Sequence, residues 1–98
     1  MYDFKFHPEA EKELVKLNKS VQILFAKVLK KIIKSPELGV DLGNKNNFDL
    51  SGCKKVYFDH KRYRVVYKVI DDEVMIYLIS IGKRDKMSVY EKASDRLA

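Results

Sequence analysis

The residues of this chain best suited to chemistry are cations that gather near a tyrosine. Residues 53–68 hold six lysines and arginines and a single acid, Asp59, and two more cations follow the apolar run that ends at Gly82. The cations are Lys54, Lys55, Lys61, Arg62, Arg64, Lys68, Lys83 and Arg84. Tyr90 comes six residues after the last of them. With a net charge of +6, this concentration favours a polyphosphate partner, and hence nucleic acid.

These residue types suit cleavage of RNA without a metal. The 2′-hydroxyl of RNA can attack the neighbouring phosphate, which requires orientation of the substrate, stabilisation of charge and proton transfer. Arginines and lysines around a tyrosine can supply all three. The sequence shows no metal-ligand spacing, no Cys-His pair and no Ser-His-Asp order, so we expect neither a metal nor a cofactor. Residue types alone do not decide between cleaving RNA and binding it.

Two predicted strands form the hairpin that would position these cations. Residues 63–70, YRVVYKVI, alternate so that Tyr63 and Arg64 begin opposite faces of one strand. Residues 74–81 are almost entirely apolar, as in a central strand covered on both sides. One face of the hairpin is therefore expected to pack, and the other to present cations.

A third strand is predicted at residues 53–59. The period-2 rule places Lys55 and Tyr57 on one face, and Lys54 on the other. His60 and Lys61 then make a tight connection to the hairpin. Cys53 is expected to be a small buried apolar residue, and since it is the only cysteine it cannot form an internal disulfide.

The remaining elements complete one α+β domain spanning residues 1–98. His7 and either Asn18 or Ser20 are expected to cap two helices, His7 having a structural role only. The predicted elements are strands at 2–6, 53–59, 63–70 and 74–81, helices at 8–17, 20–34 and 88–97, and a loop at 36–49. The order β-α-α-β-β-β-α predicts a small antiparallel sheet, with the N-terminal helical hairpin on one face and a short C-terminal helix. The other face is expected to stay partly open and to carry the basic side chains.

The composition limits where such a domain would act. The apolar fraction of 46% argues against disorder, and no apolar run is long enough to cross a bilayer. The N-terminal residues lack the pattern of a signal peptide. We therefore expect a cytoplasmic protein with no membrane partner.

Three motifs give the chain a resemblance to a known family. YRVVY at 63–67, ISIGKR at 79–84 and the following SVY at 88–90 resemble the RelE toxins of the RelE/ParE toxin-antitoxin superfamily. The opening FHPEAEKELVKLNKS and the SP that ends the second helix are similar to the wider superfamily, so the resemblance covers nearly the whole chain. The pairing of GKR with a tyrosine is more specific to RelE itself.

The resemblance implies a toxin that inhibits translation as a ribosome-dependent endoribonuclease, cutting messenger RNA in the decoding site.

 It also implies a cognate RelB-like antitoxin, a toxin-antitoxin hetero-oligomer, and the small ribosomal subunit with its 16S rRNA and messenger RNA as partners. By the same resemblance, Arg64 would stabilise the scissile phosphate. Arg84 would stabilise transition-state charge and protonate the leaving group, and Tyr90 would orient the substrate or assist deprotonation.

Lys55 matches the first of two catalytic lysines in the family, but Tyr57 occupies the position of the second. The missing lysine is a candidate general base, so Tyr57, Lys54 or Lys55 could take that role, as could His60 with its reference pKa of about 6.5. The residues expected to contact substrate are Lys54, Tyr57, Lys61, Arg62 and Lys83.

Two other functions are compatible with the same pattern. A ParE-like toxin would share the fold but inhibit DNA gyrase, and a non-catalytic module would bind RNA without cutting it. The final helix has few apolar residues, so it is expected to dock weakly and to be displaced by an antitoxin segment.

Overall fold

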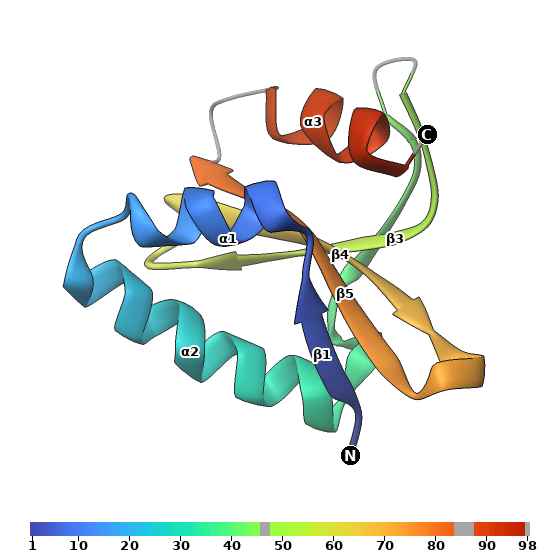
Figure 1. Ribbon diagram of the computed structural model, residues 1–98, viewed down its shortest axis with the longest axis horizontal. Helices are drawn as coiled ribbons and strands as arrows, with labels where there is room; N and C mark the ends of the chain where they lie inside the picture. Colours follow the sequence, from blue (N-terminus) through green and yellow to red (C-terminus); the bar gives the residue numbers. More distant parts are fainter. Residues whose placement is uncertain (46–47, 84–87, 98) are drawn as a thin grey trace.

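Five strands form one continuous sheet in the order β1-β5-β4-β3-β2 (Figure 1). The computed structural model describes residues 1–45, 48–83 and 88–97. The strands are β1 (Asp3–Phe6), β2 (Val40–Lys45), β3 (Phe48–Phe58), β4 (Tyr63–Ile70) and β5 (Met75–Lys83). The helices are α1 (Pro8–Val15), α2 (Lys19–Lys34) and α3 (Ser88–Leu97), with short 3₁₀ turns η1 (Pro36–Leu38) and η2 (Asp71–Glu73). The predicted α+β class, the helical hairpin and the C-terminal helix are confirmed.

The sheet is mixed, whereas an antiparallel sheet was expected. Strands β2 to β5 pair antiparallel with their neighbours, but β1 runs parallel to β5, with Asp3 opposite Met75. β5 also carries a bulge, because Val66 pairs with Ser80 and Tyr67 pairs with Leu78. Ile79 is thus the extra residue in β5. The bulge shifts the alternation of side chains along this strand.

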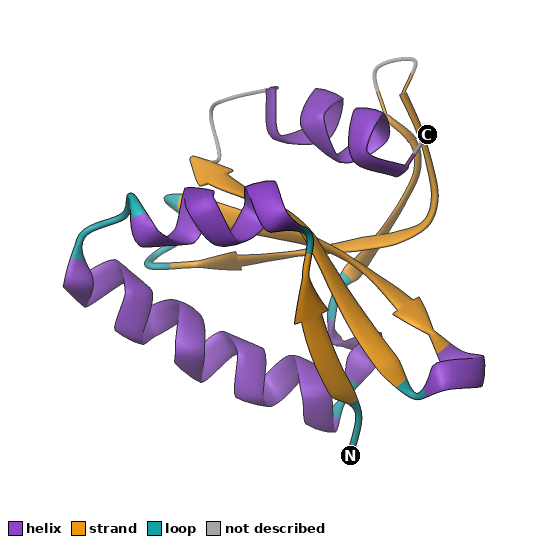
Figure 2. Ribbon diagram, in the orientation of Figure 1, coloured by secondary structure: helices purple, strands orange, loops and turns teal. Residues whose placement is uncertain are grey.

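Each face of the sheet has its own apolar core. Figure 2 shows the helices and strands that carry the residues of these cores, in purple and orange. On one face, Phe25 and Ile32 of α2 pack against Val65 and Tyr67 of β4. On the other face, Tyr90 and Ala93 of α3 pack in a cluster with Val66 of β4. The alternation of Val65 and Val66 between the two cores confirms the faces predicted for this strand. The second face is therefore partly covered by α3.

Helix α1 lies along the edge of β5 beyond the end of β1. The His7 amide donates to the Leu78 carbonyl at 2.8 Å, and the Ile81 amide donates to a Glu13 carboxylate oxygen at 3.2 Å. The His7 ring nitrogen Nδ1 accepts from the Glu9 amide at 3.1 Å, which confirms that His7 caps this helix. Asn18 caps α2 in the same manner through the Val21 amide.

The expectation of a loop over residues 36–49 is wrong. Its described residues form η1, then β2, then the start of β3, and Val40 pairs with Lys55. β2 is an edge strand with a register shift before Gly43, whose φ of +56° is a left-handed conformation that glycine adopts readily. Glycine and polar residues are tolerated in such a strand because only one of its edges is paired. The composition therefore resembles that of a loop.

Candidate functional site

Four of the predicted site residues come together on the face of the sheet that α3 covers. Lys55 and Tyr57 extend from β3, and Arg64 extends from β4 directly opposite Tyr57 in the strand register. Tyr90, on the first turn of α3, lies against them from above the sheet. Residues from three elements thus form one cluster, and the placement of Lys55 and Tyr57 on one face of their strand agrees with the predicted alternation.

Contacts within this cluster centre on the Tyr90 ring and the Lys55 ammonium. Lys55 Nζ donates to the Tyr57 hydroxyl oxygen at 2.8 Å and to the Tyr90 hydroxyl oxygen at 3.3 Å. The guanidinium carbon of Arg64 lies 4.4 Å from the centroid of the Tyr90 ring, within the range of a cation–π contact. Arg64 is only 3% exposed and Tyr90 only 1%, whereas Lys55 and Tyr57 are half-buried. Two cations and two phenol groups are held within a few ångströms of one another.

The Lys55 ammonium is held in its charged form. Burial by itself lowers the pKa of this group, but hydrogen bonds to the Tyr57 and Tyr90 hydroxyls outweigh burial and leave the pKa above its ordinary value. Lys55 therefore carries a positive charge at neutral pH. In this state it can stabilise an anion or donate a proton, but it cannot accept one.

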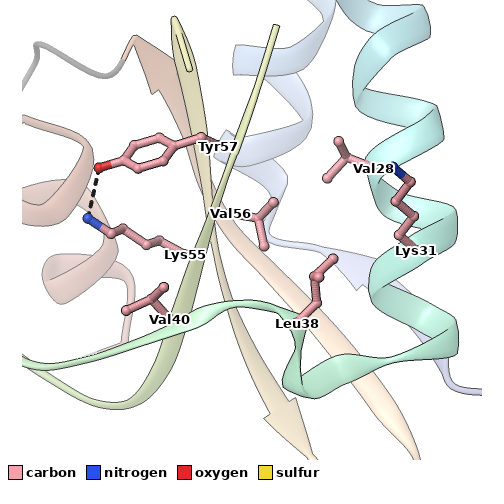
Figure 3. A pocket seen from close by; sticks show the side chains of 7 residues that line it. All are labelled: Val28, Lys31, Leu38, Val40, Lys55, Val56 and Tyr57. Atoms are coloured by element: carbon pink, nitrogen blue, oxygen red, sulfur yellow. Dashed lines mark hydrogen bonds between the residues drawn. The ribbon is translucent and has the colours of Figure 1, made fainter. Parts of the chain in front are cut away.

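A shallow pocket of about 320 Å³ adjoins this cluster at the outer edge of β3 (Figure 3). Figure 3 shows the Lys55 and Tyr57 side chains pointing away from α2, joined by their hydrogen bond, while Val56 points toward α2. The pocket lining is mostly apolar, with the exposed side chains of Leu38 and Val40 at its rim. Lys55 and Tyr57 thus belong both to the pocket lining and to the cluster around Tyr90.

The structure does not bring all the predicted residues into this cluster. Lys54 lies on the opposite face, where its Nζ pairs with Asp41 at 2.6 Å. Lys61 and Arg62 are exposed in the β3–β4 turn beside His60, and Lys83 is exposed at the end of β5. Asp59, His60 and Lys61 all have positive φ, so this turn is a left-handed one made without glycine.

Arg84 lies outside the described residues, and its predicted role stays a prediction. Among the residues that the structure does describe, no group of three or more His, Cys, Asp and Glu side chains could hold a metal ion. None of the described helices is both long and apolar enough to cross a membrane.

Sequence reasoning missed a polar cluster that fixes α3. Glu13 of α1 accepts hydrogen bonds from Arg96 and Lys92 of α3, and Arg96 also donates to the Ile79 carbonyl. Residues 13 and 96 are too far apart in the sequence for any local pattern to link them. An arginine in the last turn of a helix also has an ordinary explanation, namely the favourable interaction with the helix dipole.

Comparisons with known proteins place this arrangement in a class of toxins. Residues 4–87 match the model of the ParE toxin of the type II toxin-antitoxin system parDE. The chain therefore belongs to this family of type II toxins. Within it, the chain is RelE-like: it is 34% identical to the mRNA interferase toxin RelE of Escherichia coli strain K12, over 98% of its own length and 97% of the relative's.

Solved structures agree with this assignment. An arginine-to-alanine double mutant of the free E. coli RelE toxin superimposes with a TM-score of 0.78 at 31% identity, covering 99% of this chain and 98% of that one. The intact E. coli RelBE toxin-antitoxin complex contains a chain that matches with a TM-score of 0.71 at 32% identity, covering 88% of this chain and 100% of that one. The resemblance found in the sequence motifs is thus confirmed.

Proposed function

We propose that this toxin is an endoribonuclease that cleaves messenger RNA in the decoding site of the ribosome. The observation that best supports this proposal is the contact of one tyrosine, Tyr90, with two cations, Lys55 and Arg64, on the face of the sheet. Positive charge and hydroxyl groups in this arrangement suit a phosphodiester that becomes more negative as it reacts. The name of the E. coli relative, an mRNA interferase, supports the same activity.

The reaction needs only the RNA and the side chains. The 2′-hydroxyl gives up its proton and its oxygen attacks the adjacent phosphorus, forming a new P–O bond. The bond from phosphorus to the 5′-oxygen of the next nucleotide breaks, and that oxygen takes up a proton. The products are a 2′,3′-cyclic phosphate and a 5′-hydroxyl. In this proposal Arg64 and the charged Lys55 stabilise the phosphorane, and Arg84 protonates the leaving oxygen.

Tyr57 is our candidate for the proton acceptor, acting as the phenolate, because a phenol that still holds its proton cannot take up another. Lys55 is a poor candidate because its pKa is raised, and Lys54 lies on the opposite face. His60 is exposed in a turn beyond the end of β3. The Tyr57 oxygen already accepts a hydrogen bond from the Lys55 ammonium, which would hold a phenolate formed there.

Burial of Arg64 supports a requirement for the ribosome. Since this side chain is 3% exposed and lies against the Tyr90 ring, a phosphate would reach the guanidinium only after the groups that cover it, the ring among them, move aside. Free RNA must lose conformational entropy as it binds, whereas messenger RNA in the ribosome is already ordered. We therefore propose that ordered RNA displaces the ring more effectively than free RNA does.

We also infer that the toxin is inhibited by a RelB-like antitoxin in a hetero-oligomer. The match to the toxin-antitoxin complex of E. coli supports this inference. The net charge of +6 further suits an acidic partner segment.

Primer extension on programmed ribosomes tests the activity. The wild-type chain should cut the decoding-site codon, Arg84→Ala should abolish these cuts, and Tyr90→Phe should reduce them. If folded wild-type protein cuts nothing and instead inhibits supercoiling by DNA gyrase, the function is that of a ParE toxin, for which the matched family is named. If Arg84→Ala lowers only the affinity for RNA, the protein is a binding module.

A further inference from the structure

The position of Tyr90 depends on how α3 is attached to the sheet. Near its start, the helix is anchored by the buried side chains of Tyr90 and Ala93. The half-buried Leu97 adds a contact at its end. This small apolar area was the reason to expect weak docking. A second anchor is formed by polar groups near the end of the helix.

This second anchor is a forked ion pair between α3 and α1. Arg96 donates through Nη1 to Glu13 Oε1 at 2.8 Å and through Nη2 to Glu13 Oε2 at 3.1 Å. The side chains are 11% and 16% exposed. A bidentate pair with little exposure is more specific in geometry than an ordinary surface salt bridge.

Both partners of the pair are also bonded to β5. Arg96 Nη1 donates to the carbonyl of the bulge residue Ile79 at 2.7 Å, and Glu13 Oε1 accepts from the Ile81 amide at 3.2 Å. The pair therefore joins two helices to the strand at its bulge. Because Arg96 lies six residues along α3 from Tyr90, the helix is held near both ends.

The charge of Glu13 is maintained in this setting. Burial alone raises the pKa of its carboxyl, but hydrogen bonds from Arg96, the Ile81 amide and Lys92 outweigh burial and leave the pKa below its ordinary value. The pair is therefore fully ionised at neutral pH.

We propose that Glu13 and Arg96 are positioning residues for Tyr90. They fix α3, and thereby hold the backbone of Tyr90 at a constant place over Arg64 and Lys55 while its ring moves. This inference rests on the proposed function for its effect on cleavage, but not for its effect on the ring. The hydrogen bonds of Glu13 and Arg96 described above run to each other, to Lys92 and to β5. Their effect passes through the helix.

Glu13→Gln tests this proposal, because it removes the charge and keeps the shape. Glu9→Gln is the matched control, since Glu9 lies on the same helix and pairs with Lys12 at 3.3 Å in an exposed, local salt bridge. The first readout is the NMR signal of ¹³C-labelled Tyr90, assigned by its absence in Tyr90→Phe. The second is the maximal cleavage rate on saturating programmed ribosomes.

We expect Glu13→Gln to shift or broaden the Tyr90 signal and to lower the maximal rate by about 10- to 100-fold, with the half-saturating ribosome concentration little changed. Glu9→Gln should change neither readout. Arg96→Lys keeps the charge but loses the forked geometry, so it should have an effect in the same direction, and it provides an independent variant if Glu13→Gln does not fold.

An unchanged Tyr90 signal in folded Glu13→Gln would overturn the proposal, whether or not the rate falls. A shifted signal with an unchanged rate would also overturn it, because positioning would then have no effect on the reaction. If the signal shifts but no variant, wild type included, cleaves RNA, the proposed function fails while the control of Tyr90 by this pair stands.

Discussion

Replacing Tyr67 by phenylalanine should destabilise the domain far more than the loss of one oxygen atom suggests. Tyr67 is fully buried in β4, and its hydroxyl makes two hydrogen bonds. It donates to the Pro36 carbonyl at 2.8 Å and accepts from the Gly39 amide at 2.9 Å. These bonds fix the segment that joins α2 to β2, and hence the edge strand that pairs with Lys55.

The magnitude follows from the two groups left behind. Phenylalanine would leave a buried carbonyl and a partly buried amide without partners, and each such group costs about 1–3 kcal/mol. Because Gly39 can recover part of its loss from water, we expect a total of about 2–4 kcal/mol in the free energy of unfolding. For a domain of this size, that corresponds to a fall in Tm of roughly 10–30 °C.

Urea unfolding followed by circular dichroism measures this change. Tyr63→Phe is the matched control, because Tyr63 lies on the same face of β4 and packs its ring against Phe58, with no hydrogen bond to its hydroxyl in the described residues. If Tyr67→Phe costs no more than Tyr63→Phe, the bridging hydroxyl does not have the role argued for it.

Comparison of the wild type with Tyr67→Phe also gives a prediction about the pH dependence of stability. Burial raises the pKa of Tyr67, with the Gly39 amide opposing it, so the folded state holds this proton more tightly than the unfolded state does. Stability from this group is therefore complete below a pH of about 10 and is lost as the pH rises further. The difference in the free energy of unfolding between the wild type and Tyr67→Phe should therefore decrease above that pH.

Three further predictions concern the surroundings of the site. Gly39→Ala should lower stability by about 1–3 kcal/mol in a thermal melt, because its Cβ would lie 2.5 Å from the Tyr67 hydroxyl and 2.9 Å from the Lys55 carbonyl; an unchanged Tm would contradict this. Lys55→Met should reduce cleavage on the ribosome by about 10²- to 10³-fold while the protein stays folded, and a rate near that of the wild type would remove Lys55 from the mechanism. The pKa of Glu13 is lowered in the folded state, so its contribution to stability is present above a pH of about 4.5 and is lost as the pH falls further. The urea midpoint of the wild type should therefore exceed that of Glu13→Gln at neutral pH, and the two midpoints should converge at acidic pH.

The strand alternation in the sequence predicted which side chains share a face within each strand, and the family resemblance, not the alternation, grouped them into one candidate site. Lys55, Tyr57 and Arg64 share a face because side chains on strands have a period of two, and β3 and β4 are joined by a short turn that fixes their register. The same rule placed Lys54 on the opposite face. Sequence reasoning still retained Lys54 as a candidate, because only its ion pair with Asp41 reveals an alternative role.

The features that were missed depend on contacts between distant parts of the chain. β2 pairs with β3 despite a composition typical of loops, and β1 lies parallel to β5, the strand most distant from it in the sequence. The bulge at Ile79 cannot be read from an apolar run in which every residue is suited to burial. The ion pair of Glu13 and Arg96 forms only when the two ends of the domain meet.

The placement of β5 between β1 and β4 determines the order in which the domain can fold. This strand is the last of the five in the sequence, yet the first strand pairs with it directly. β1 and α1 must therefore wait for residues 75–83 before they find their partners, and the non-local pairing slows folding relative to a helical protein of similar length. We expect a nascent chain that ends before β5 to remain sensitive to protease and unable to assemble the site. A newly synthesised toxin would then become active only after nearly all of it has been made, and protease digestion of chains stalled before and after β5 measures this directly.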